Sequence, residues 1–239
     1  MGISAISFVI FNPLVKSDPS NIDFFEILEP VEYGAVGVMA IFYAKRFNWK
    51  IEIFSKSYFA LGISYLLLVP GMVAYYYYEL YAPNESHFVT ISGILFTLYN
   101  PFVIYHLATN CHYFKRKFSF SEKFFIFSLP LIVIFSYAFL IFKFQGTMTP
   151  DSLLSFPDLL LNPVAMVFAI IGIRTFKNSF LGIAWMFTAI GILLIEIADF
   201  GYVYLELFDL YSRDNPIQNL FHISNMIMLY GLYKHYRTY

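Results

Sequence analysis

The chain has 239 residues, of which 59 % are hydrophobic and only 13 % are charged, and its formal net charge is −1. Soluble domains carry about 25 % charged residues, so this composition excludes a water-soluble domain and indicates a polytopic membrane protein. The single cysteine, Cys111, excludes an intrachain disulfide framework. The near-neutral charge balance argues against a nucleic-acid partner, and the lipid bilayer is the expected surrounding.

Residues 1–26 are predicted to form an extracytoplasmic or interfacial segment, because their apolar run is too short to cross a membrane. Residues 27–239 are predicted to form one all-α domain, a bundle of seven transmembrane helices. Each predicted span is long enough to cross a hydrocarbon layer of about 30 Å at 1.5 Å per residue. The spans cover about residues 27–47, 58–81, 88–113, 124–144, 153–176, 180–208 and 216–236.

Basic residues are concentrated in alternate loops of this arrangement, and of the 15 only Lys16, Lys143 and Arg213 fall on the other side. The positive-inside rule then predicts an extracytoplasmic N-terminus and a cytoplasmic C-terminus, in the cell membrane. The acids are distributed the opposite way, because of the 16 only Glu52 and Glu122 fall in cytoplasmic loops. This excess predicts an acidic outer vestibule, which either keeps the outer surface soluble or attracts cations.

Two polar stripes lie inside the last two predicted spans. Glu196 and Asp199 stand three residues apart in the sixth span, and Asn219, His222 and Asn225 stand three apart in the seventh. At that spacing each set shares one helix face. An ionisable side chain at membrane depth costs about 3 kcal/mol or more and normally faces the bundle interior or a watery cavity. The stripes are therefore the leading candidate for a ligand or ion site.

Other spans place polar residues at the same depth. These are Glu29 and Glu32 in the first span and Asp158 and Asn162 in the fifth. If the helices follow one another in a ring, the seventh lies between the first and the sixth, so Glu32, Asp199 and His222 are expected to converge. The simpler interpretation places Glu29 and Asp158 in headgroup water at helix N-termini. It also places the tyrosines at 75–78 in an aromatic belt at the membrane interface.

One imidazole with two or three carboxylates suits zinc, manganese or iron. Glu32, Glu196, Asp199 and His222 are therefore a candidate ligand set for a divalent metal. The sequence has no HExxH motif, and no second histidine stands three or four residues from His222. A structural hydrogen bond between His222 and a carboxylate is the competing interpretation.

A second polar set lies deeper, in the third predicted span. Asn100 precedes Pro101, and His106 follows within two helical turns. The proline removes one helix hydrogen bond, so Asn100 is expected to satisfy backbone groups at a kink. The alternative is a proton or ion path that continues from the outer polar residues through Asn100 to His106.

The last two predicted spans contain Trp185, the run Ala198-Asp199-Phe200-Gly201-Tyr202 and the run Gly231-Leu232-Tyr233. In these residues the chain resembles the seven-helix input modules of prokaryotic sensor kinases and cyclases, which implies a role in sensing. Rhodopsins have the same number of helices, but span 216–236 has no lysine before Lys234 to hold a retinal Schiff base. Membrane hydrolases of the ceramidase and adiponectin-receptor type carry an H-x-x-x-H motif in their last span, which is missing here.

We therefore expect a receptor or sensor in which an extracytoplasmic cation, proton or small ligand engages polar residues in the outer leaflet. The signal is expected to pass to a separate cytoplasmic or membrane partner through the basic end of the bundle. One alternative is a proton or cation transporter or conduit. A second is a metal-dependent intramembrane hydrolase, and an enzyme is the less favoured class. The expected binding residues are Glu32, Asp158, Asn162, Glu196, Asp199, His222 and Asn225.

Overall fold

A computed structural model describes residues 24–46, 52–81, 91–115, 117–144, 146–148, 153, 155–176, 182–208, 210–211 and 215–238. Most of the predicted N-terminal segment, residues 1–23, lies outside these ranges. The described residues form α-helices joined by short connections and contain no strand. The prediction of an all-α fold is confirmed.

The helices follow the apolar runs of the sequence closely. In chain order they are α2 (Phe24–Arg46), α3 (Glu52–Tyr81), α4 (Ile91–Lys115), α5 (Phe120–Phe144), α7 (Phe156–Phe176), α8 (Gly182–Leu207) and α9 (Gln218–Thr238). The largest difference from the predicted bounds is at the start of α3, which begins at Glu52 instead of residue 58. Helix α7 continues through Pro163.

Six of the helices are long and apolar enough to cross a membrane, namely α2, α3, α4, α5, α7 and α8. The protein is therefore a polytopic helical membrane bundle. Helix α9 is not among the six, although it was predicted as a seventh span. It has the length, but Gln218, Asn219, His222 and Asn225 in its first half lower its mean hydropathy. Its sequence alone does not distinguish a crossing helix from a polar helix held against the bundle.

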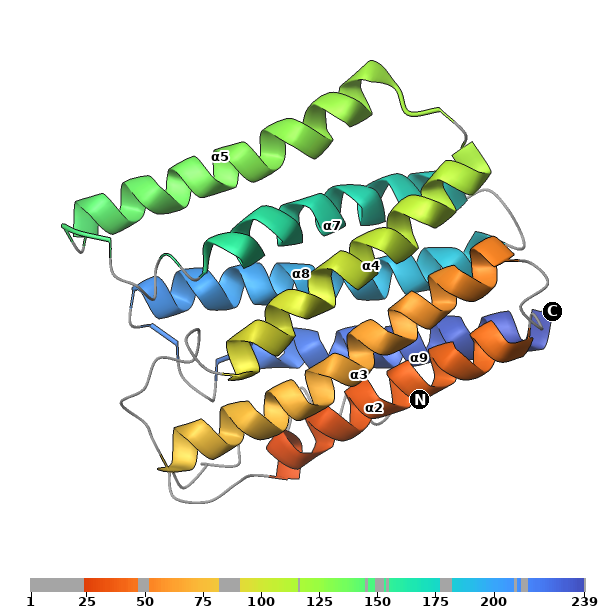
Figure 1. Cartoon of the computed structure of the whole chain (residues 1–239), viewed down its shortest axis with the longest axis horizontal. Coiled ribbons are helices and arrows are strands. Elements are labelled where there is room, and N and C mark those ends of the chain that lie inside the picture. Colours follow the sequence, from red (N-terminus) through yellow and green to blue (C-terminus); the bar gives the residue numbers. More distant parts are fainter. Residues whose placement is uncertain are drawn as a thin grey trace.

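The helices pack side by side with their axes roughly aligned (Figure 1). Contacts run from α2 to α3, α3 to α4, α4 to α7, α7 to α8, α8 to α9 and from α9 back to α2, which closes a ring. Helix α9 thus lies between the first and the penultimate described helices, as the ring arrangement predicted. The ring does not follow the chain at one point, because α4 contacts α7 directly and α5 packs on the outside of α7 (Figure 1).

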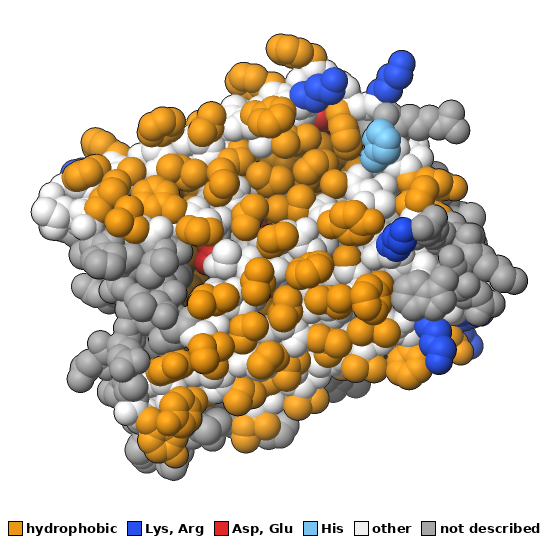
Figure 2. Space-filling view, in the orientation of Figure 1, with side chains coloured by type: hydrophobic (Ala, Val, Ile, Leu, Met, Phe, Trp, Pro, Cys, Tyr) orange, Lys and Arg blue, Asp and Glu red, His pale blue; other side chains and the backbone are white. Residues whose placement is uncertain are grey.

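Helix α5 occupies this outer position because it is apolar on almost every side. Phe127 and Phe135 are more than 70 % exposed, and Leu131 and Ile132 are more than half exposed. Such a surface suits lipid and needs no partner helix. The face of the molecule in Figure 2 is likewise dominated by hydrophobic side chains, with most of its visible Lys and Arg side chains near the end where α2 finishes and α9 terminates.

Helices α2 and α3 approach most closely where two glycines face each other. A Cβ placed on Gly62 would lie 2.9 Å from the backbone oxygen of Gly37 and 2.5 Å from Cγ1 of Ile41. The reciprocal Cβ on Gly37 would lie 3.0 Å from the backbone oxygen of Gly62. Gly37 and Gly62 therefore allow a close crossing of the two helices.

We expect Gly62→Ala to lower the free energy of unfolding by about 1–3 kcal/mol, because the added methyl group has to push the α3 backbone away from α2. Gly34→Ala is the matched control, since a Cβ there would meet only Val69, at an ordinary contact distance of 3.7 Å. Unfolding of the detergent-solubilised variants, followed by circular dichroism, measures both effects. Equal stability of the two variants would contradict the close crossing.

Candidate functional site

A buried hydrogen-bonded group joins α2 to α9. His222 Nδ1 donates to Glu32 Oε2 at 2.8 Å, and Asn225 Nδ2 donates to the same oxygen at 3.3 Å. All three side chains are buried. The structure therefore brings together Glu32 and His222, two of the three residues expected to converge, and adds Asn225 to them. The carboxylate of Glu32 receives two donors from α9, the helix with the most polar residues.

A second buried carboxylate lies one turn earlier in α2. Tyr33 donates its hydroxyl hydrogen to Glu29 Oε1 at 2.8 Å, and Tyr76 donates to Glu29 Oε2 at 3.2 Å. Glu29 is only 5 % exposed, so it lies inside the bundle and not in headgroup water. The tyrosine run of α3 accordingly has two roles, because Tyr77 is 58 % exposed, as an interfacial belt requires, whereas Tyr76 points its hydroxyl group inward.

Glu196 on α8 is fully buried and lacks comparable partners. Neither of its carboxylate oxygens accepts a hydrogen bond from any residue that the structure describes. The hydroxyl group of Tyr99 lies close to this carboxylate but outside hydrogen-bond geometry, and Asp158 and Asp199 lie within electrostatic range. A buried carboxylate without donors is costly, by about 1–3 kcal/mol or more, and more still for a charged group.

The polar side chains that α7 contributes to this level of the bundle are also buried. The carboxylate of Asp158 lies next to the side chains of Thr97 and Asn100 on α4, and Asn162 follows one turn later on the same helix. Asp158 is thus covered by protein and not by headgroup water. Asn100 contacts this acid, and α4 continues as a helix through Pro101.

Asp199 completes this level of the bundle. It is half-buried on α8, one turn after Glu196, and lies within electrostatic range of Asp158 and of Glu29. We refer to the five carboxylates and the polar groups around them as the acidic cluster. Its members are Glu29, Glu32, Tyr33, Tyr65, Tyr76, Tyr99, Asn100, Asp158, Asn162, Glu196, Asp199, His222 and Asn225.

The acidic cluster contains more negative than positive groups. Among the described residues no lysine or arginine is buried. The cluster includes one histidine, His222. Charges in a low-dielectric interior have to be neutralised nearby. Among the described residues of the cluster, His222 is the basic side chain that can offset part of this charge.

The structure does not assemble the predicted metal ligands. Within the described ranges no three His, Cys, Asp or Glu side chains lie together in a way that could hold a metal ion. Glu32 and His222 bond to each other, while Glu196 lies among groups of α4, α7 and α8. The four residues Glu32, Glu196, Asp199 and His222 share one level of the bundle but do not form one coordination site.

A separate polar group lies further along the bundle, between α3 and α4. His106 Nδ1 lies 2.8 Å from the hydroxyl oxygen of Ser57 and 3.1 Å from its backbone oxygen, and Asn110 Nδ2 donates to the Ser57 hydroxyl at 2.9 Å. All three residues are buried. His106 therefore takes part in a local contact between two helices.

Fully buried apolar side chains separate His106 from the acidic cluster. Leu61 lies between Ser57 and Tyr65 on α3, Val103 lies between Tyr99 and His106 on α4, and Ile192 precedes Glu196 by one turn on α8. All three belong to one hydrophobic core. The predicted path from Asn100 to His106 would have to cross this apolar layer.

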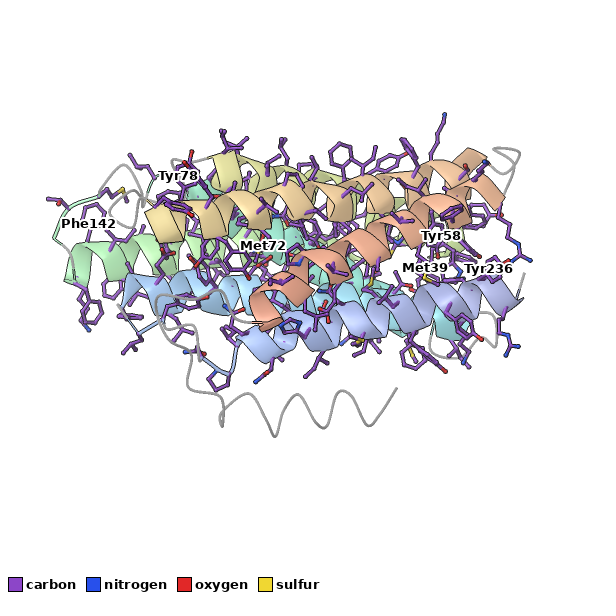
Figure 3. The ribbon with its side chains drawn as sticks, turned by 90° about the horizontal axis from the view of Figure 1, so that it is seen from below. Met39, Tyr58, Met72, Tyr78, Phe142 and Tyr236 are labelled. Carbon is purple, nitrogen blue, oxygen red and sulfur yellow. The ribbon has the colours of Figure 1, made fainter. Side chains whose placement is uncertain are left out.

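Sequence reasoning missed an aromatic group beside His106. The ring of Trp185 lies 4.7 Å from the ring of His235 and 5.1 Å from the ring of Tyr58, measured between centroids. The hydroxyl group of Tyr43 lies 3.4 Å from His235 Nδ1. Tyr58 and Tyr236 appear at the same end of the bundle in Figure 3, with Tyr78 toward the opposite end. The spacing of Met228, Leu232 and His235 along one face of α9 is the signal that could have identified His235 as buried.

The fold and this site define a class of protein: a helical membrane bundle with an acid-rich interior at one end and a histidine and tryptophan group at the other. Comparisons with protein-family models, with curated proteins and with solved structures found no match.

Proposed function

We propose that the protein is a membrane receptor or sensor in which protons or small cations bind at the acidic cluster. The observation that carries this proposal is the burial of Glu29, Glu32, Asp158 and Glu196 in a bundle whose described residues include no buried lysine or arginine. The binding of a cation offsets this charge, so occupancy changes the stability of the packing around it.

Helix α9 is the element suited to carry the response. At the acidic cluster its His222 and Asn225 bond to Glu32. At the other end its His235 packs against Trp185, and Arg46 of α2 donates to the backbone oxygen of Tyr236 at 2.5 Å. A change in the Glu32 contacts at one end therefore acts on a helix that also contacts the other end.

The proposal includes the orientation that the charges favour. Helix α9 lies between α2 and α8. This position supports the inference that α9 crosses the membrane as a seventh span, because its neighbours cover its polar face. The acidic cluster then lies in the outer half of the bundle. The basic residues of α2 and α9, including Arg46 and Arg237, lie at the cytoplasmic end, where a signalling partner binds.

The alternatives have less support. A conduit requires polar groups across the bundle, whereas Leu61, Val103 and Ile192 form an apolar layer between the acidic cluster and His106. A metal-dependent hydrolase requires ligands that converge, and the residues that the structure describes provide no such group. Reception needs only the buried acids and a helix that responds to them.

The fluorescence of Trp185 tests reception directly. The chain has two tryptophans, so a Trp49→Phe variant leaves Trp185 as the only reporter, about three helical turns from the acidic cluster. We expect acidification or addition of a cation to change the emission of Trp185, because α9 shifts against its ring. Glu32→Gln is expected to reduce the change. An emission spectrum that stays constant across pH and across sodium, potassium and calcium would contradict reception.

A further inference from the structure

The acidic cluster consists of two halves that differ in their hydrogen bonds. In the first, which we call the paired half, the carboxylates of Glu29 and Glu32 each receive two donors. The second, which we call the unpaired half, lies among α4, α7 and α8 and contains Glu196. Both halves are buried, so differences in exposure do not explain the contrast.

Unpaired buried oxygens are concentrated in the second half. In this half, the buried side-chain oxygens without a hydrogen-bond partner among the described residues belong to Tyr99, Asn100, Asp158, Asn162 and Glu196. The neighbouring hydroxyl oxygen of Tyr65 also has no such partner. The paired half retains two such atoms, Glu32 Oε1 and Asn225 Oδ1. The orphaned groups in both halves are all oxygens, from carboxylates, amide carbonyls and phenols, and none is a nitrogen.

We propose that the unpaired half binds one sodium-like alkali cation through Glu196 and the neighbouring oxygens of α4 and α7, which deepens and rests on the proposed cation reception. Oxygen ligands from carboxylates and amide carbonyls are those that hard cations prefer. One monovalent charge neutralises the carboxylate of Glu196. The neutral oxygens of Asn100, Asn162 and Tyr99 then complete the shell.

Three other occupants fit these residues less well. Protonation of Glu196 removes its charge but still leaves a buried hydroxyl donor and the other oxygens without partners. Transition metals favour nitrogen, sulfur and several carboxylates, and no three His, Cys, Asp or Glu side chains converge in the described part of the chain. A calcium ion normally takes several carboxylates at once, which the same finding disfavours.

The test compares the melting temperature of the purified protein in sodium chloride and in choline chloride at equal ionic strength and constant pH. We expect sodium to raise Tm by about 3 °C or more, because a ligand that binds only the folded state stabilises it. Glu196→Gln and Asn162→Ala are expected to lose this shift. Glu122→Gln, the same change at the exposed start of α5 and outside the acidic cluster, is the matched control and should keep it.

Three results would overturn the proposal: equal melting temperatures in the two salts, a sodium shift that survives in Glu196→Gln and in Asn162→Ala, or a response to calcium but not to sodium. A Trp185 signal that still responds to acidification would then show that reception stands and only the sodium assignment fails. Conversely, sodium stabilisation with no Trp185 response would show a bound ion without reception.

Discussion

Replacing His222 with leucine is expected to lower the free energy of unfolding by about 3–5 kcal/mol, because it removes the shorter of the two hydrogen bonds that the buried Glu32 carboxylate accepts from α9. The side chain of leucine fills much of the same space but donates no hydrogen bond. Glu32 then keeps only Asn225 as a donor, at 3.3 Å. The carboxylate stays buried because α9 still covers it, so the cost is not relieved by solvent.

A double-mutant cycle isolates this effect. The variant Glu32→Gln/His222→Leu removes the carboxylate together with its donor, and we expect it to recover most of the lost stability because no carboxylate is then left buried without that donor. His112→Leu is the matched control, since His112 is exposed on α4 and should change stability by less than about 0.5 kcal/mol. Chemical unfolding in detergent measures the free energy of unfolding of all three variants. A His222→Leu variant as stable as His112→Leu would disprove the importance of the pair.

Replacing Glu196 is expected to change the free energy of unfolding in the opposite direction. In sodium-free buffer, Glu196→Leu should raise the free energy of unfolding by about 1–3 kcal/mol, because it removes a buried carboxylate that no described residue satisfies. The surrounding core supplies apolar contacts, since Ile192 and Ile195 on the same helix are fully buried. Few substitutions of a buried charged residue are expected to stabilise a protein, so the sign is informative.

Glu29→Leu provides the comparison for Glu196→Leu. Glu29 is equally enclosed, but its loss leaves the hydroxyl groups of Tyr33 and Tyr76 without their acceptor, so this variant should be destabilised. Parallel unfolding curves for both variants in choline chloride decide the matter. If Glu196→Leu loses as much stability as Glu29→Leu, the carboxylate of Glu196 has partners and the division of the cluster into two halves is wrong.

The helices and the outline of the cluster could be predicted because charged side chains stand out against apolar sequence. Glu32 and His222 were recognisable as buried for this reason, and the ring arrangement placed α9 next to α2. Whether α9 crosses the membrane could not be read in the same way, because the polar residues that mark its buried face also lower its hydropathy.

Other features carried no signal in the sequence. The outer position of α5 could not be predicted, because a helix that is apolar on nearly every side has no face that identifies its neighbours. The tyrosines of the cluster were missed because a tyrosine suits both lipid and a buried hydrogen bond. Tyr65 and Tyr99 lie in the middle of their helices, away from the interfacial ends, and this position was the available clue.

The closure of the ring by the first and last described helices has a consequence for biogenesis. Helix α2 obtains its partners on α9 only after roughly 180 further residues have been synthesised, which takes roughly 9–36 s at 5–20 residues per second. During that interval Glu32 has to reside in or near the bilayer without His222 and Asn225. The newly made α2 therefore depends on temporary protection, either by the insertion machinery or by water at the membrane surface, until α9 has been synthesised.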